Sequence, residues 1–421
     1  MKIGIIGSGG REHALCEAIK NSENVDEIYC IPGNAGTYAI ATNVDLNIQD
    51  FDSIKNFIDM NKIDLIVVGP EKPLVEGLVD FLEENDIMVF GPNKIASKLE
   101  GSKIFTKKLC KKYEIPSAKF GIFKKIDEAK IFLKKSMFPI VVKADGLAAG
   151  KGVYICENLQ EADTAIKEIF DGKFGDSGQV LIEEFLNGEE MSFFIISDGK
   201  NIKKFGTAQD HKRVGEGDKG QNTGGMGAYS PSRLENEILD QKILNKIIVP
   251  TLQALKDLDT NFKGFLYAGL IIIDNEPYLI EYNVRMGDPE CQTILPRLKT
   301  DFLEVLMAVI EKRLDRLNLE WHNDKTLSIV LCSKGYPESY ENNKEIRNLD
   351  KVILAENEFI FHAGTKIEDS KIISNGGRVL NCVVKSSSFK KSRESVLNII
   401  KKINWENGFY RKDIGFKVID K

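Results

Sequence analysis

A segment in the second half of the chain, LIEYNVRMGDPE at residues 279–290, gathers residue types that bind metal ions. If it forms a strand, side-chain alternation places Glu281 and Asn283 on one face, two residues apart. Hard oxygen ligands on one rigid face suit a Mg²⁺ ion that bridges nucleotide phosphates. Further charged residues follow at once: Arg285, Asp288 and Glu290. The same set could instead form a buried arginine–carboxylate cluster without a metal.

A second candidate site is GLAAGKG, residues 146–152, which comes shortly after an apolar run that contains Lys143. The segment does not match a Walker A loop, because three residues, not four, separate the two key glycines and glycine occupies the Ser/Thr position. Lysines beside pliable backbone nevertheless suit a polyphosphate, with Lys143 and Lys151 as the cations. The alternative is a solvated hairpin that carries two surface lysines.

The segment VLIEEFLNGEE, residues 180–190, predicts a strand, a short acidic connection and a glycine turn. As a nucleotide hinge it would offer the backbone of Glu184 and Leu186 to the adenine edge. The carboxylate of Glu190 would then accept hydrogen bonds from ribose hydroxyls. Ordinary surface acidity is the more common explanation of such residues.

Three glycine-containing turns lie near the N-terminus: GSGGRE at 7–12, PGNAGT at 32–37 and GPEKPL at 69–74. The first fails the dinucleotide-binding fingerprint, because Glu12 stands where that pattern requires glycine. What remains is a strand, a glycine turn and a helix N-terminus, whose free N–H groups suit a phosphate. A tight turn that needs glycine only for its backbone geometry would give the same pattern.

The elements that position these turns alternate between short apolar runs and helical stretches, which predicts a parallel β/α domain over residues 1–100. The expected strands are 2–6, 27–31, 65–68 and 88–90, and the expected helices are 11–21, 51–60 and 75–85. Ligands of such sheets bind where strand ends meet glycine turns, so three turns on one edge suggest an anionic ligand.

The rest of the chain predicts two further units of mixed helices and strands. Residues 101–325 begin with a Lys-rich helix and include a small lid-like subdomain at about 120–190. Residues 326–421 combine short strands with one amphipathic helix, as in a compact α+β domain. The predicted fold class is therefore α/β and α+β, multidomain. No Pro- or Ser-rich linker separates the units, so we expect them to pack against one another.

The composition excludes several classes of protein. The 421 residues, 42% hydrophobic and 29% charged, are enough for about three domains. A net charge of −5 gives no global basic field for a nucleic acid, and the first apolar run is too short for a signal peptide or a membrane span. The seven scattered cysteines lack a CxxC pair and the four histidines lack zinc-site spacing. We expect a cytoplasmic protein with reduced thiols and no nucleic-acid or membrane partner.

Taken in order, these segments resemble the phosphoribosylamine–glycine ligase family, also called glycinamide ribonucleotide synthetases, of the ATP-grasp superfamily. The resemblance covers essentially the whole chain. It depends on GSGGREHAL, PGNAGT, VVGPEKPL, VVKADGLAAGKGV, IEEFLNGEE, QDHKR, NTGGMGAYSP, IEYNVRMGDPECQ, FHAGT, NGGRVL and FYRKDIG. The most specific parts are RMGDPECQ and NTGGMGAYSP. The resemblance implies a pre-ATP-grasp domain at 1–100, an ATP-grasp domain at 101–325 and a C-terminal domain at 326–421.

The resemblance implies a reaction in de novo purine biosynthesis. ATP converts glycine to glycyl phosphate, and 5-phosphoribosylamine then displaces the phosphate to give glycinamide ribonucleotide, ADP and phosphate. Such catalysis depends on positioning and charge neutralisation, so no Ser-His-Asp device is needed. The implied cofactors are ATP and Mg²⁺, with Mn²⁺ as an alternative ion. The enzyme that supplies phosphoribosylamine is an implied transient partner.

The resemblance also assigns roles to individual residues. Glu281 and Asn283 would hold Mg²⁺, while Lys103 and Lys143 would neutralise the ATP phosphates. The nucleotide would further contact Glu183, Glu184, Leu186 and Glu190; the reacting groups would contact Arg285, Asp210 and Asp288; and phosphoribosylamine would contact Gly9, Asn34, Gly36, Glu71 and Lys72. Arg285 would stabilise the acyl phosphate, and the two aspartates would orient the glycine ammonium. The loop 215–227 would be a lid that excludes water.

One departure concerns the strand 266–273, which has Gly269 and no carboxylate where many ATP-grasp enzymes carry a further metal ligand. A second metal site would be weaker, or another group would fill it. Gln221 also stands where the family often has proline. Two other functions stay open: a sister ATP-grasp ligase or formate-using transferase, and a noncatalytic nucleotide- or sugar-phosphate-binding regulator. The N-terminal turns and RMGDPE disfavour the first, and the complete metal-and-arginine set disfavours the second.

Overall fold

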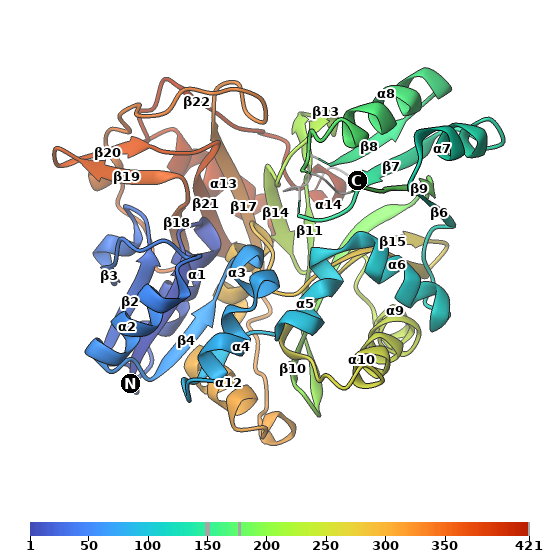
Figure 1. The fold of residues 1–421 in the computed structure, drawn as a ribbon. Helices are drawn as coiled ribbons and strands as arrows, with labels where there is room; N and C mark the ends of the chain where they lie inside the picture. The colour runs from blue at the N-terminus through green and yellow to red at the C-terminus, as the bar shows by residue number, and fades with distance from the viewer. Residues whose placement is uncertain (148–151, 176–177, 420–421) are drawn as a thin grey trace.

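The computed structural model describes residues 1–147, 152–175 and 178–419 (Figure 1). Lys151, a predicted phosphate-binding cation, lies outside the described residues. No helix in the described part of the chain is long and apolar enough to cross a membrane. The seven cysteines are free and buried.

The N-terminal unit, at the lower left of Figure 1, is a parallel sheet in the order β3-β2-β1-β4-β5. Its strands are β1 (Lys2–Gly7), β2 (Glu27–Pro32), β3 (Thr42–Asn43), β4 (Leu65–Val68) and β5 (Val89–Phe90). Its helices are α1 (Gly10–Ile19), α2 (Phe51–Asn61), α3 (Glu71–Glu76), α4 (Leu78–Glu83) and α5 (Lys94–Gly101). The single helix predicted at 75–85 is wrong, because Gly77 takes a left-handed φ of 101° that separates α3 from α4.

The lid-like subdomain is a separate four-stranded sheet in the order β6-β9-β7-β8, at the upper right of Figure 1. Its elements are β6 (Phe120–Phe123), α7 (Ile126–Leu133), β7 (Ile140–Ala144), β8 (Val153–Cys156), α8 (Leu159–Phe170) and β9 (Val180–Glu184). The Lys-rich helix α6 (Lys103–Lys112) precedes it, and the hydroxyl of Ser102 caps this helix by accepting the N–H of Phe105 at 3.0 Å. The lid has a hydrophobic cluster of its own.

A large sheet, antiparallel at every strand pair, forms the body of the molecule, in the order β16-β15-β10-β11-β14-β17-β21-β18 with β22 beside β17. Its strands are β10 (Glu189–Asp198), β11 (Ile202–Asp210), β14 (Gly227–Ser230), β15 (Lys263–Ile273), β16 (Glu276–Asn283), β17 (Lys325–Ser333), β18 (Glu358–His362), β21 (Arg378–Ser386) and β22 (Gly408–Phe409). The pairing of β14 with β17 continues the sheet across residue 325, where we predicted a domain boundary. The predicted boundary at residue 325 therefore divides the chain but not the sheet. The domain boundaries as a whole stay predictions.

The remaining elements cover this sheet and connect its strands. They are β12 (Arg213–Gly215), β13 (Lys219–Asn222), α9 (Glu237–Ile243), the π-helical turn η2 (Leu244–Ile248), α10 (Val249–Lys256), α11 (Glu290–Ile294), α12 (Phe302–Ile310), β19 (Thr365–Glu368), β20 (Lys371–Ser374), α13 (Phe389–Ile400) and α14 (Phe416–Ile419). Short 3₁₀ turns lie at Thr37–Ala39, Leu295–Arg297, Leu314–Arg316 and Leu349–Lys351.

Two hydrophobic clusters join the units. One contains Leu74 of the N-terminal domain together with Leu266 and Leu270 of β15. The other contains Ile5 of β1 and Phe361 of β18 together with central residues of the large sheet. Because apolar side chains from different units are buried against one another, the units hold fixed relative positions, and the clefts between them are well defined.

Truncating a side chain in a shared cluster should destabilise the whole molecule. Leu266 is fully buried, so Leu266→Ala should lower the free energy of unfolding by about 3 kcal/mol. Urea unfolding measures the change, and Ile353→Ala, at a side chain that is 85% exposed, is the control. Equal losses in the two variants would contradict the assignment of this core.

Candidate active site

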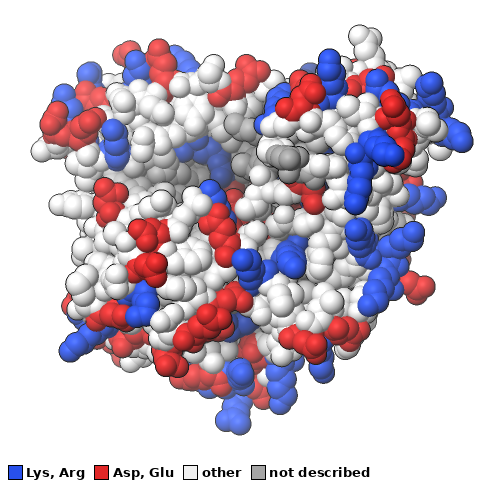
Figure 2. Space-filling view, viewed as in Figure 1, with Lys and Arg blue, Asp and Glu red and all other residues white. Residues whose placement is uncertain are grey.

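A cavity of about 780 Å³ lies between the carboxyl edge of the N-terminal sheet, the lid and the large sheet. Figure 2 shows this hollow in the upper half of the face, with basic side chains visible inside it. The volume is in the range of small-molecule sites in proteins. Residues predicted from widely separated motifs line it together: Gly9, Glu71, Lys103, Lys143, Glu183, Glu184, Leu186, Glu190, Asp210, Glu281, Asn283, Arg285 and Asp288.

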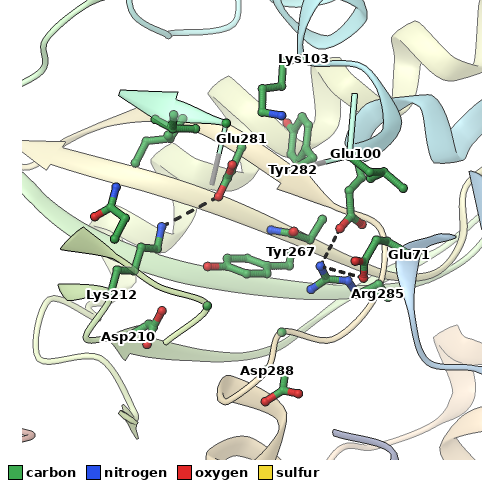
Figure 3. A pocket seen from close by; sticks show the side chains of 18 of the residues that line it. Glu71, Glu100, Lys103, Asp210, Lys212, Tyr267, Glu281, Tyr282, Arg285 and Asp288 are labelled. Atoms are coloured by element: carbon green, nitrogen blue, oxygen red, sulfur yellow. Dashed lines mark hydrogen bonds and ion pairs between the residues drawn. The ribbon is translucent and has the colours of Figure 1, made fainter. Parts of the chain in front are cut away.

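The predicted metal ligands Glu281 and Asn283 lie near the end of β16, two residues apart, and both line the cavity. Figure 3 shows Glu281 with Lys212 on one side and Lys103 nearby. Burial by itself would raise the pKa of Glu281. The positive charges of Lys212, Lys143 and Lys103 outweigh this effect and hold the pKa below its usual value. A charged carboxylate beside an amide oxygen fits a hard divalent cation. Among the described residues no group of three or more His, Cys, Asp and Glu could hold a metal, so phosphate oxygens would have to complete the coordination.

Gly269 lies directly opposite Glu281 in the register of β15 and β16. A Cβ atom at this position would approach Cγ of Glu281 to 3.3 Å. The glycine thus leaves room for the Glu281 side chain.

Two buried lysines of the site share one buried carboxylate as their counterion. Glu183 on β9 contacts Lys143 Nζ at 2.9 Å and Lys107 Nζ at 3.2 Å. Lys103 Nζ donates to the carbonyl oxygen of Gly146 at 2.8 Å, and burial lowers its pKa. Sequence reasoning missed Lys107, although its position one helical turn after Lys103 is a usable signal. It also missed that Glu183 is the counterion of these lysines.

The predicted nucleotide hinge borders the same cavity. Glu184 lines the cavity, and its carboxylate accepts the backbone N–H of Lys119 at 2.8 Å. Leu186 lines the cavity through an irregular segment between β9 and β10. Glu190 pairs with Lys212 at 3.0 Å, and Lys212 in turn lies 3.9 Å from Glu281. The motif QDHKR therefore contributes a cation that we did not predict.

Arg285 lies between two carboxylates of the N-terminal unit, as Figure 3 shows. Its guanidinium contacts Glu100 at 2.6 Å and Glu71 at 3.3 Å. The second oxygen of Glu100 accepts the N–H of Val284 at 2.8 Å. Burial raises the pKa of Glu100 to about 7, against the opposing effect of Arg285. Among the described atoms Nε of Arg285 is buried without a hydrogen-bond partner, so it can donate to a ligand.

The two predicted aspartates differ in their surroundings. Burial and the nearby charge of Glu290 raise the pKa of Asp210 well above its usual value. Burial has the same tendency at Asp288, but Arg378 and Arg11 outweigh it, so the pKa of Asp288 lies below its usual value. Asp288 is therefore better suited than Asp210 to pair with an ammonium group, because a lowered pKa favours the charged carboxylate.

The N-terminal turns contribute unequally. Gly9 and Glu71 line the cavity, whereas Asn34, Gly36 and Lys72 are absent from its described lining. The Asn34 amide donates to the carbonyls of Ser8 and His362 at 2.9 and 2.8 Å, and its oxygen accepts the N–H of Gly36. Lys72 donates to Gln49 on the surface at 2.8 Å. Direct substrate contacts of these three residues stay predictions, and the described role of Asn34 is to shape the turn.

The C-terminal unit also reaches the cavity, which sequence reasoning did not predict. Arg378 on β21 donates to the carbonyl oxygens of Asp288, at 2.6 Å, and of Gly224. Its motif, NGGRVL, lies far along the chain from the rest of the site, and no spacing rule connects them.

A lid sheet above a large antiparallel sheet, with lysines facing a carboxylate–amide pair, defines an ATP-grasp enzyme. The biotin carboxylase domain of the Hydrogenobacter thermophilus 2-oxoglutarate carboxylase, a structure with MgADP and bicarbonate, has the same fold (TM-score 0.74, 18% identity, covering 97% of this chain and 91% of that one). The predicted ATP-grasp fold class is therefore confirmed.

The particular family follows from sequence matches. Models of the phosphoribosylglycinamide synthetase N, ATP-grasp (A) and C domains match residues 1–100, 101–291 and 326–417. The phosphoribosylamine–glycine ligase of Brucella melitensis is 44% identical over 100% of this chain and 99% of its own length. The crystal structure of the Thermotoga maritima phosphoribosylamine–glycine ligase has a TM-score of 0.86 at 34% identity, covering 99% of this chain and all of that one. The chain belongs to the phosphoribosylglycinamide synthetase family, which confirms the predicted class, an ATP-dependent carbon–nitrogen ligase of purine biosynthesis.

The raised pKa of Glu100 predicts a pH-dependent stability. The folded protein binds this proton more tightly than an unfolded chain with the ordinary pKa of 4.5, so the stabilising contribution is present at low pH and is lost as pH rises through about 7. Glu100→Gln removes this equilibrium. Between about pH 5 and pH 8 the wild type should lose up to about 3 kcal/mol more unfolding free energy than the variant.

Urea unfolding at the two pH values measures this difference, and Glu84→Gln, at an exposed carboxyl, is the control. If Glu100→Gln lost stability with pH as steeply as the wild type, the environment assigned to Glu100 would be wrong.

Proposed function

We propose that this chain joins glycine to 5-phosphoribosylamine through glycyl phosphate, with release of ADP and phosphate. The observation that supports this most directly is the meeting of three groups in one cavity: the Glu281–Asn283 pair, the lysines of α6 and β7, and the turns of the N-terminal sheet. The first two suit a nucleotide with its metal, and the third suits a sugar phosphate.

The nucleotide would lie between the lid and the large sheet. Lys103 and Lys143 would neutralise its phosphates, and Glu183 would orient both Lys143 and Lys107. The backbone at Glu184 and Leu186 would contact adenine, and Glu190 would contact the ribose. Glu281 and Asn283 would hold Mg²⁺, or Mn²⁺ as an alternative ion, which neutralises phosphate charge when bound.

Glycine would bind between Arg285 and the two aspartates. The unpartnered Nε of Arg285 can donate to the acyl phosphate oxygens, and the charge of Asp288 suits the glycine ammonium. Asp210, whose pKa is raised by burial and by the charge of Glu290, would be a second hydrogen-bonding partner. Phosphoribosylamine would enter along Gly9 and Glu71, opposite the lysines, so that its amine faces the activated carboxyl carbon. With the reactants held in this order, catalysis depends on position and charge neutralisation.

The identity of the carboxylate and the amine separates this proposal from a sister ligase. ADP release should require glycine and freshly generated phosphoribosylamine together, with glycinamide ribonucleotide as the product identified by mass. Omitting each component in turn is the control. Release with a different carboxylate or amine would overturn the substrate assignment, and tight nucleotide binding without turnover would favour a regulator. Transient delivery of phosphoribosylamine by its producing enzyme and a cytoplasmic location stay predictions.

The metal assignment has its own test. Glu281→Gln should lower kcat by about a hundredfold, because a neutral amide binds a divalent cation more weakly than a carboxylate. Steady-state ADP release against Mg²⁺ concentration measures the effect. Glu276→Gln is a matched control on the same strand, since this exposed side chain pairs with Lys242 and Lys246 away from the cavity. Near wild-type turnover in Glu281→Gln would contradict the metal role.

A further inference from the structure

The loop that we predicted as a lid, residues 215–227, overlaps a hairpin at residues 213–222 that is made of β12 and β13. Both ends of the hairpin lead into the cavity. Lys212 precedes it, and Asn222 and Gly224 line the cavity at its other end. A shift of the hairpin would therefore move cavity-lining groups on both sides.

The hairpin does not stand free in solvent, because the C-terminal segment 409–419 packs against it, and Figure 1 places α14 beside β13. Arg411 makes the central contacts. Its side chain is 1% exposed and forms two hydrogen bonds with Asp413, at 2.8 and 2.7 Å. Its remaining terminal nitrogen donates to the carbonyl oxygen of Arg213 and to the carboxylate of Asp218, both at 2.9 Å.

Further contacts repeat this connection between the segment and the hairpin. Lys417 Nζ lies 2.6 Å from Asp218, and the N–H of Gly217 donates to Asp413 at 2.7 Å. The N–H of Gly415 donates to His211 at 3.2 Å, directly beside Lys212. Arg411 and Lys417 of the segment are thus paired with Asp218 of the hairpin, and the Glu216 carboxylate of the hairpin accepts the N–H of Lys412 at 3.2 Å.

A buried arginine is stable only when its donors are paired, and its planar fork accepts few geometries. Arg411 therefore selects one position of the hairpin relative to the C-terminal unit. Gly224, at the end of the loop, is held separately, since its N–H donates to the Tyr336 hydroxyl at 2.9 Å and its carbonyl accepts from Arg378. The C-terminal unit consequently holds the loop at both ends.

We infer that segment 409–419 is a latch that holds hairpin 213–222 over the cavity, with Arg411 as the positioning residue of the ligase reaction. Arg411 is not part of the described cavity lining and acts through Lys212 and residues 222–224. The latch serves the reaction by keeping water from the acyl phosphate, so that ADP release stays coupled to product formation. This inference depends on the proposed glycyl phosphate intermediate.

The test compares Arg411→Ala, Arg411→Lys and Asp218→Asn with the full-length wild type. Product formation in Arg411→Ala should fall roughly tenfold to a hundredfold, as for other displacements of positioned groups. ADP release should fall less than product formation, so more ADP should form per molecule of product. The KM for glycine should rise, while the KM for ATP should stay near the wild-type value. Arg411→Lys should restore part of the coupling. Arg347→Ala is the matched control, because this exposed arginine of the same unit pairs only with Glu345 through its side chain.

Asp218→Asn makes the test independent of the folding of Arg411→Ala. It removes the negative charge of Asp218, which Arg411 and Lys417 contact, and leaves the Arg411–Asp413 pair in place. Amide hydrogen exchange over residues 213–225 adds a readout that does not depend on activity, and exchange should be faster in both variants. Wild-type coupling, glycine KM and exchange in Asp218→Asn and in every folded Arg411 variant would overturn the latch, even if the melting temperature fell. A wild type that makes no product would contradict the proposed function, and unchanged exchange in the variants would then still overturn the latch.

Discussion

Cations that can neutralise phosphate groups repel one another where water is excluded, so the cavity can assemble only with carboxylates between them. Glu183 separates Lys107 from Lys143 at the lid, and Arg285 lies between two acids of the N-terminal unit. Lys212 in turn contacts Glu190 and lies near Glu281. Some of these pairs lie within one sheet, but Arg285 meets its acids, and Lys107 meets Glu183, only when separate units pack together. Incoming phosphates and a metal ion can then exchange with contacts that already exist.

Hydrophobic packing holds the units in the positions that these charge pairs require. The hydrophobic clusters that contain Leu266 and Phe361 each draw side chains from more than one unit, whereas the lid has its own cluster. A separate core allows a subdomain to move as a body, while shared cores hold the N-terminal sheet against the large sheet. The arrangement suits a reaction in which nucleotide is covered by one element and the other reactants are held on a rigid base. Through Arg378 and Arg411, the C-terminal unit adds contacts to the wall opposite the lid.

Much of the fold could be predicted from the sequence because its signals are local. Apolar runs of strand length and glycine turns located four of the five N-terminal strands to within about two residues, whereas the two-residue strand β3 was missed. The helix predicted at 75–85 failed at Gly77, where apolar periodicity continues across a residue whose backbone turns left-handed. The continuity of the large sheet across residue 325 also escaped prediction, since strand pairing between β14 and β17 joins segments about a hundred residues apart.

By itself, the sequence determined the family and the order of the units, and it supplied candidate metal- and phosphate-binding residues, because these depend on residue type and short spacing. Only the tertiary structure decided which side chains meet. It paired Glu183 with lysines, turned Asn34 inward to shape its turn, placed Lys72 on the surface and brought Arg378 and Arg411 to the site from the far end of the chain. The physical reason is that the partner of a charged side chain depends on distance and on the exclusion of water. Both are set only when separate segments pack together.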